Sequence, residues 1–335
     1  MKTTREIYCQ FLQSTQINFT CTYLSEYIPG LDENSIYRYL QQEKLTPRLV
    51  WEKAKEVIQY SPQACVIFDD TVIDKDFSYK IDGVKKQYSG NAHGLVKGIG
   101  VVTCLYYNPE VDKYWVIDFR IFDYSKDGKT KLDHVEDMLA MIKFREIPFS
   151  AVLMDAWYAT TKMMLLIDKD YHKLYYCPIK DNRQVDDTQG QEGYKNVTEL
   201  VWQEEEIASG KLVKIKKFPG EYKHMLFRVV ISTDKTEWIV TNDLTQDSTD
   251  DTQKASAIRW KIEQLHRESK QNTGLEKCQC RTNRSQRNHI CCAFLVWHSL
   301  TQTARELGSN IYQVKRHLLD DYMFGEMRSP KFKFG

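Results

Sequence analysis

The sequence predicts a mixed α/β fold, in which a sheet with helices on both faces is interrupted by a β-rich insertion and preceded by a helical module. The prediction rests on the period of the apolar residues. That period is helical up to residue 60, mixed from 61 to 180, strand-like from 181 to 252 and helical again afterwards. With 42% hydrophobic residues among 335, the chain can bury one large core or two moderate ones.

Composition narrows the class of protein further. The 47 Lys and Arg residues nearly balance the 46 Asp and Glu residues, so the overall charge gives no sign of a nucleic-acid partner. No apolar run reaches the roughly 18 residues that a membrane-spanning helix needs, and 1–8 lacks the apolar core of a signal peptide. The nine cysteines form no Cys-x-x-Cys pair. We therefore expect a cytoplasmic protein with reduced thiols and no membrane partner.

Residues 1–60 are predicted to form a small helical module. Helices are expected at 5–13, 22–27, 32–43 and 47–58, separated by turn signals such as Pro29-Gly30. The stretch 21–40 has the proportions of a helix-turn-helix, which would present Arg38 and Gln41 to DNA. A helical cap on the next domain, with a solvated polar face, fits the same degenerate pattern equally well.

Residues 61–180 are predicted to form the first part of the α/β core. Apolar or β-rich runs at 64–68, 100–107, 114–122 and 150–154 indicate strands, and a helical period at 131–145 separates the last two. A helix at 160–168 and a strand at 173–179 would complete this part of the sheet.

The second half begins with a β-rich insertion at 181–252, in which residues alternate at 211–217, 226–232 and 237–241. Helical periods return at 253–307, which we assign to the C-terminal helices of the core. The remainder, 308–335, is a polar and basic tail, expected to be a helix followed by extended chain.

Two aspartates mark candidate chemistry. Asp69 follows the apolar run 64–68, and Asp155 follows the run 150–154. Ligands gather at strand ends of open α/β sheets, and two carboxylates at one edge can share a metal ion. Each aspartate alone is more typical of a helix cap or turn than of a metal site. Asp70 is the main rival of Asp69, because both lie at the same strand end.

A third element is the predicted helix at 258–270. One apolar stripe is formed by Ile258, Ile262 and Leu265, and the stripe beside it carries Arg259, Glu263, His266 and Lys270. The apolar face would therefore pack against the core, while the neighbouring face presents the Glu263 carboxylate between cationic side chains. The competing interpretation is a solvated helix with pairs of charges four residues apart.

The spacing Arg259-x3-Glu263-x6-Lys270 resembles the signature of DDE transposases from bacterial insertion sequences, in the subgroup with a Tyr-x2-Arg-x3-Glu-x6-Lys helix. Asp-Asp-Thr at 69–71 resembles the first acidic block of that family, and Leu-Met-Asp-Ala-Trp-Tyr at 153–158 resembles the second. The resemblance implies a ribonuclease H-like core. It also fits the 108 positions between Asp155 and Glu263, because such enzymes carry a β-rich insertion there.

The same resemblance implies a reaction. Asp69, Asp155 and Glu263 would hold two Mg²⁺ ions, for which Mn²⁺ can substitute, with Asp69 between them. The expected function is cut-and-paste transposition: cleavage at the element ends, then strand transfer into target DNA. The expected partners are DNA, as terminal inverted repeats and as target, and a second copy of the chain on the DNA ends. The protein would associate with the bacterial nucleoid when bound.

Local basic charge supports a DNA partner. Between 259 and 287 eight basic residues face three acidic ones. We expect DNA contacts from Arg259 and Lys270, whose charges would lie next to the cut, and from Arg267 and Lys277. The insertion carries Trp202 and Trp238, either of which could stack on an unpaired base or belong to the core.

One position departs from the family pattern. Ser256 occupies the place of the tyrosine that precedes the arginine and helps to hold the terminal phosphate. This departure leaves open how the DNA end is held and whether a hairpin intermediate forms. Two other functions stay open as well: a catalytically retired or co-opted transposase that binds specific DNA, and a structure-specific nuclease on the same core.

Overall fold

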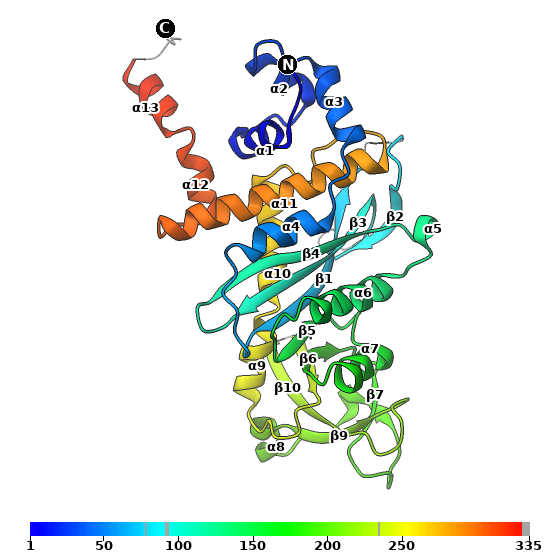
Figure 1. Ribbon diagram of the computed structural model, residues 1–335. Coiled ribbons are helices and arrows are strands. Elements are labelled where there is room, and N and C mark those ends of the chain that lie inside the picture. Colours follow the sequence, from blue (N-terminus) through cyan, green and yellow to red (C-terminus); the bar gives the residue numbers. More distant parts are fainter. Residues whose placement is uncertain (77, 79, 91–93, 234, 330–335) are drawn as a thin grey trace.

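The computed structural model describes residues 1–76, 78, 80–90, 94–233 and 235–329 (Figure 1). Its N-terminal part consists of the helices α1 (Arg5–Ser14), α2 (Cys21–Tyr27), α3 (Glu33–Gln42) and α4 (Pro47–Lys55). Side chains of Thr4, Thr20 and Asp32 accept hydrogen bonds from the first turns of α1, α2 and α3, which explains where these helices begin. The predicted helices are present, and only α4 ends clearly earlier than predicted, by three residues.

The central sheet has the mixed, ribonuclease H-like arrangement that the sequence predicted. Its strands are β1 (Cys65–Asp74), β3 (Gly94–Asn108), β4 (Lys113–Phe122), β5 (Ala151–Met154) and β6 (Leu174–Ile179). They lie side by side in the order β4–β3–β1–β5–β6. Strands β1, β5 and β6 are parallel, and β3 is antiparallel to both β1 and β4. A short strand that the sequence analysis missed, β2 (Lys85–Ser89), pairs with the beginning of β3.

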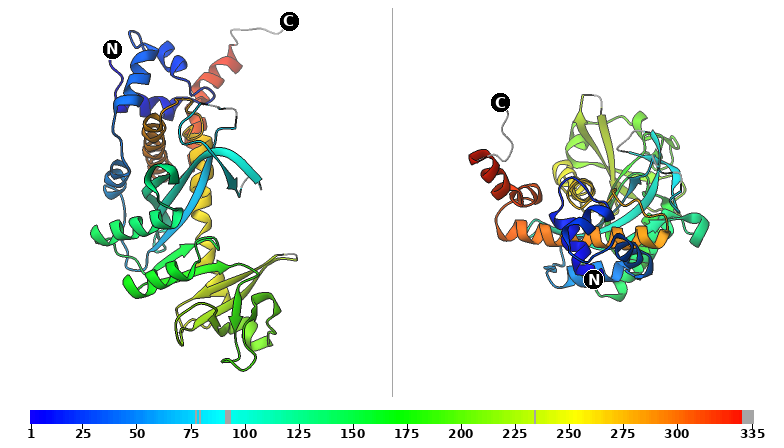
Figure 2. Two further views of the ribbon diagram at one scale, coloured as in Figure 1. Left: turned by 90° about the vertical axis from the view of Figure 1, so that its right-hand side faces the viewer. Right: turned by 90° about the horizontal axis from the view of Figure 1, so that it is seen from above.

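Helices cover both faces of the sheet (Figures 1 and 2). One face carries α6 (Lys131–Phe144) and α7 (Thr161–Leu165), and the other carries α10 (Trp260–Asn272) and α11 (Asn283–Glu306). Alternate residues of β1 separate these layers, because neighbouring side chains of a strand point to opposite faces. Phe68 packs in the cluster that includes Met138 of α6, whereas Ile67 packs in the cluster that includes Ile262 of α10.

The insertion extends the same sheet. It contains β7 (Gln184–Asp186), β8 (Lys195–Asn196), α8 (Glu204–Ser209), β9 (Lys211–Ile215), β10 (His224–Ser232) and β11 (Lys235–Thr241). Strand β11 pairs antiparallel with β6, with Trp238 opposite Ile179 and Thr241 opposite Tyr176. The described strands therefore form one sheet of eleven strands, in which a path of ten runs from the core into the insertion and β4 pairs with β3 beside it. Helix α9 (Thr249–Ala257) leads back to α10.

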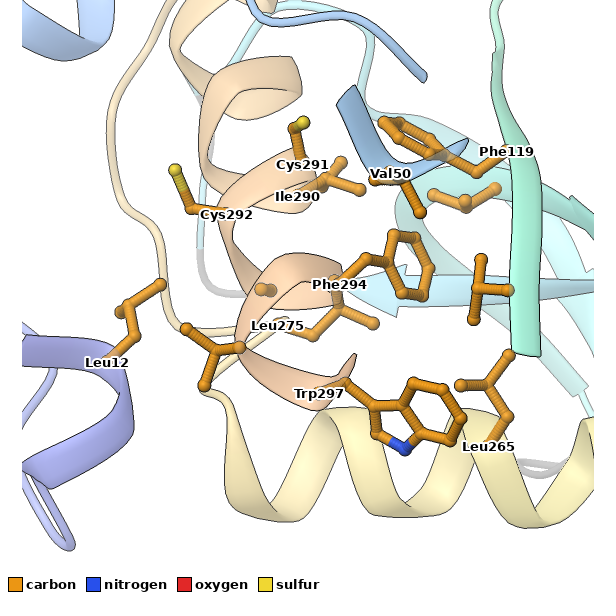
Figure 3. Close-up of a cluster of buried hydrophobic side chains, with 14 of the residues drawn as sticks. Leu12, Val50, Phe119, Leu265, Leu275, Ile290, Cys291, Cys292, Phe294 and Trp297 are labelled. Atoms are coloured by element: carbon orange, nitrogen blue, oxygen red, sulfur yellow. The ribbon is translucent and has the colours of Figure 1, made fainter. Parts of the chain in front are cut away.

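Helix α11 contributes the largest group of buried apolar side chains in the C-terminal part (Figure 3). Phe294 packs against Phe119 of β4 with ring centroids 5.2 Å apart, and Trp297 lies against Leu265 of α10. Leu12 of α1 belongs to the same cluster. Helices α1 and α3 thus pack on α11, on the side that faces away from the sheet, whereas α4 lies against both α11 and β4 (Figure 1).

The tail contains two helices, α12 (Ile311–His317) and α13 (Asp320–Arg328), and its last residues, 330–335, lie outside the described residues. Lys315 does not add to a basic surface, as we had expected of this tail. Its ammonium group is buried and donates hydrogen bonds to the carbonyl oxygens of Leu12, at 2.9 Å, and Gln13. In the described part of the chain, no helix is long and apolar enough to span a bilayer.

Candidate active site

Asp69 and Asp70 are neighbours in β1 whose side chains point to opposite faces of the sheet. Asp69 lies on the face of Ile67, which is covered by α10, and Asp70 lies on the face of Phe68, which is covered by α6. The carboxylate of Asp70 is engaged there: it accepts a hydrogen bond from the Tyr158 hydroxyl at 2.7 Å and forms an ion pair with Lys131 at 2.5 Å.

Asp155 follows β5 directly. Strands β1 and β5 are parallel and in register up to the pair Phe68 and Met154, so Asp69 and Asp155 are the next residues on each strand. Neighbouring strands lie about 4.8 Å apart, which brings the two aspartates side by side. The carboxylate of Asp155 accepts a hydrogen bond from the backbone N–H of Ala156.

Glu263 lies in the first turn of α10. The apolar stripe predicted for this helix is present in part, since Ile262 and Leu265 are fully buried and hold the helix against the sheet. This orientation points Glu263 toward the aspartates. Arg259, at the N-cap of α10, donates a hydrogen bond to Glu263 at 3.0 Å, and its own side chain is largely buried.

Burial and neighbouring charges shift the pKa values of two of the three carboxyl groups. The pKa of Asp69 is raised to about 8, mainly by burial and also by the negative charges of Asp70 and Asp155, while the backbone N–H of Asp70 and the charge of Arg259 act in the opposite direction. Burial also raises the pKa of Glu263, with Arg259 acting against the shift and Asp155 adding to it. Buried carboxylates near one another form a site that attracts cations.

These acids are not yet arranged as ligands. Among the described residues no group of three or more His, Cys, Asp and Glu side chains is placed to hold a metal ion. Glu263 is turned to Arg259, and Asp155 is turned to its own backbone. The donor set itself fits Mg²⁺, because it offers only carboxylate oxygens and an excess of negative charge.

Comparison with known proteins decides the family. The family described as "Transposase DDE domain" matches residues 61–298, a range that contains all three acids. The chain belongs to this DDE transposase family. No curated protein matches the sequence. Among solved structures, "Drosophila P element transposase strand transfer complex" is similar, with 11% identity over 99% of this chain and 88% of that chain and a TM-score of 0.33.

The basic residues predicted to contact DNA fall into two groups in this DDE transposase chain. Arg267 and Lys277 are exposed, as are Arg38 and Gln41 on α3. Lys270 has a different environment. Its ammonium group donates to the carbonyl oxygen of Val72 at 2.8 Å and pairs with Glu276 at 2.8 Å, so it joins α10 to β1.

The two tryptophans proposed to stack on a base lie against each other. The rings of Trp202 and Trp238 are stacked with centroids 6.0 Å apart, and Trp238 is only 7% exposed. Each ring therefore covers one face of the other. The sequence analysis missed Trp157 and Trp260, which are 46% and 54% exposed and adjoin the site residues Asp155 and Arg259. Their position next to these site residues was the signal that could have identified them.

Ser256 lies on α9 and is 6% exposed. The helix axis breaks directly after it, between α9 and α10, where Ile258 and Arg259 close single turns onto Ala255 and Ser256. The position at which the subgroup carries a tyrosine is therefore buried in this chain, next to the break between two helices.

Proposed function

We propose that the protein is a metal-dependent transposase of the bacterial insertion-sequence type, in the Tyr-Arg-Glu-Lys subgroup, which cleaves DNA at element ends and transfers the ends into target DNA. The observation that carries the proposal is the convergence of Asp69, Asp155 and Glu263 from three elements on one face of a mixed sheet. Membership of the DDE transposase family supports a catalytic role for these three acids.

Asp69 would lie between two Mg²⁺ ions, with Asp155 and Glu263 each holding one of them. When bound, these ions supply Lewis-acid activation of the attacking hydroxyl and stabilisation of the leaving oxygen. The protein's own part begins at Glu263, which exchanges its hydrogen bond with Arg259 for the ligand role. That exchange frees the guanidinium, and a guanidinium can neutralise a DNA phosphate beside the cut.

The rest of the chain would serve the DNA. The module at 1–60 is proposed to bind the terminal inverted repeats through α2 and α3, with Arg38 and Gln41 on its surface. The exposed Arg267 and Lys277 would follow the backbone near the site. Two ends are joined in one event, so we propose a homodimer on DNA, in a cytoplasmic protein associated with the nucleoid.

The experiment is cleavage of a labelled duplex that carries the terminal repeat flanking the gene, in Mg²⁺ or Mn²⁺. Wild-type protein is expected to cut at the repeat boundary, and Glu263→Gln is expected to bind the duplex without cutting it. Repeat binding without cleavage by the wild type would indicate a retired transposase acting as a DNA-binding protein. Equal cleavage of branched DNA that lacks the repeat would indicate a structure-specific nuclease.

A further inference from the structure

We propose that Tyr158, Asp70 and Lys131 form a bridge that fixes the separation between Asp69 and Asp155, which makes them positioning residues of the metal site. This inference rests on the proposed function, since it concerns the same carboxylates. It assigns a role to the second aspartate of the Asp-Asp-Thr block, which points away from the other acids.

The backbone alone does not fasten Asp155 to β1. The register between β1 and β5 ends at Phe68 and Met154, one residue before the two aspartates. After Asp155 the chain turns, with the N–H groups of Tyr158 and Ala159 donating to the Asp155 carbonyl oxygen. The Tyr158 hydroxyl then reaches back across the strands to Asp70 at 2.7 Å. The turn that carries Asp155 is thereby tied to the residue next to Asp69.

Lys131 completes the bridge from a third element. It is the first residue of α6, a position at which the helix dipole disfavours a cation. Its ammonium group nevertheless lies 2.5 Å from the second carboxylate oxygen of Asp70, and 5.6 Å from the ring centres of both Phe122 and Trp157. Lys131 thus holds the Asp70 carboxylate by an ion pair, and it contacts the turn that follows Asp155 through the Trp157 ring.

The bridge can be cut without opening a cavity. Tyr158 is 1% exposed, and phenylalanine keeps its ring while losing only the hydroxyl. Removal of a group that orients metal ligands from behind typically weakens metal affinity or activity by about 10- to 100-fold.

The test compares wild type with Tyr158→Phe in two measurements. The first is Mn²⁺ binding without DNA, followed by calorimetry and by the electron paramagnetic resonance signal of a coupled Mn²⁺ pair. The second is kcat and KM for cleavage of the repeat duplex. Tyr158→Phe is expected to weaken binding of the second ion and to lower kcat by about tenfold or more, with KM for DNA within about twofold.

Matched variants separate positioning from general stability. Lys131→Met is expected to reproduce the effect, and Lys131→Arg is expected to restore the coupled Mn²⁺ signal. Lys129→Met removes a different ion pair of the same region, with Asp137, and Tyr124→Phe removes an exposed hydroxyl; both should behave as wild type. If Tyr158→Phe does not fold, the comparison of Lys131→Met with Lys131→Arg tests the bridge by itself.

The outcomes distinguish the two proposals. Unchanged Mn²⁺ binding in both Tyr158→Phe and Lys131→Met overturns the bridge. A wild type that binds a coupled Mn²⁺ pair but cuts no DNA overturns the proposed function, while loss of that pair in the variants still supports the bridge. A wild type that binds no Mn²⁺ overturns both.

Discussion

The guanidinium of Arg259 lies 3.0 Å from the carboxylate of Glu263, one helical turn further along α10. Both residues belong to the signature from which the function was inferred, and they are joined by a hydrogen bond from the Arg259 Nη1 to the Glu263 carboxylate. A resting ion pair of this kind protects a half-buried carboxylate, and it makes metal binding a competition with an arginine.

The first prediction concerns this competition. Arg259→Gln should tighten Mn²⁺ binding in the absence of DNA by several-fold, because Glu263 no longer has to leave a cation. The same variant should lose cleavage, since the charge next to the phosphate is removed. Titration followed by calorimetry measures the affinity, with Arg267→Gln as an exposed control. Weaker Mn²⁺ binding in Arg259→Gln would show that the arginine orients Glu263 for the metal.

The second prediction concerns the pH dependence of Asp69. Its pKa is raised from the ordinary value to about 8 in the folded protein, so the folded state holds a proton that the unfolded state releases above pH 4. Stability contributed by this group is complete at low pH and is lost as the pH rises toward 8. Asp69→Asn should therefore raise the free energy of unfolding at pH 9 by about 2 to 4 kcal/mol, and by little at pH 4.

The measurement for Asp69 is urea unfolding without divalent metal at both pH values. Asp70→Asn serves as the contrasting variant, because it loses charge-assisted hydrogen bonds from Tyr158 and Lys131 and should destabilise the protein. A stabilisation by Asp70→Asn that equals that of Asp69→Asn would contradict the assignment of the buried, unneutralised acid to Asp69.

The third prediction concerns the loss of stability at low pH that is caused by His224. Burial lowers the pKa of His224 to about 3, and its two ring nitrogens have no hydrogen-bond partner among the described residues. The unfolded state takes up a proton near pH 6.5 that the folded state refuses, so stability falls as the pH drops from 6.5 toward 3. His224→Phe, which suits the rings of Phe218 and Tyr222 around it, should reduce this loss.

Urea midpoints at pH 7.5, 6 and 5 measure the effect on His224, in an Asp69→Asn background that removes the opposite dependence. Burial also lowers the pKa of three further histidines to about 3 or 4, namely His266, His289 and His298. They should preserve part of the dependence of stability on pH in the variant. A slope that His224→Phe leaves unchanged would mean that this histidine takes up its proton as readily in the folded state as in the unfolded state.

The fourth prediction separates the basic residues by role. Lys270→Met should lower the free energy of unfolding by about 1 to 3 kcal/mol, because Val72 and Glu276 lose a buried charged partner. The slope of log affinity for DNA against log salt should change little. Lys277→Gln, at an exposed position, should leave stability unchanged and reduce that slope by about 1. A smaller salt dependence of DNA affinity in Lys270→Met would instead show that Lys270 contacts DNA.

Local signals in the sequence predicted much of this molecule. The apolar run before Asp69 and the stripe of Ile262 and Leu265 are short-range patterns, and both elements are present. The strand was expected to end before Asp69 and Asp70, but β1 continues to Asp74, so both aspartates lie inside the strand and not at its end. Two expectations needed partners far away in the chain. Lys270 pairs with Val72, 198 residues earlier, and Trp202 stacks on Trp238. Periodicity carries no information about such pairs, because it reports which face is buried and not what lies opposite.

The choice between Asp69 and Asp70 shows the same limit. Strand alternation states that the two side chains point in opposite directions, but it does not state which direction meets α10. That information lies in the order of the strands and the side on which each helix crosses. Tyr158 and Lys131 were likewise outside the sequence analysis, because a hydroxyl and an ammonium group that converge on one carboxylate come from two separate elements.

The pairing of β6 with β11 makes the insertion mechanically continuous with the core. A domain on a flexible tether could swing over bound DNA like a lid, whereas this one shares a ladder of hydrogen bonds with the strand beside β5. Any movement of the insertion must therefore twist the sheet, and a twist would be transmitted through β6 and β5 to Asp155. A force applied to the insertion would therefore reach the carboxylates through the sheet itself.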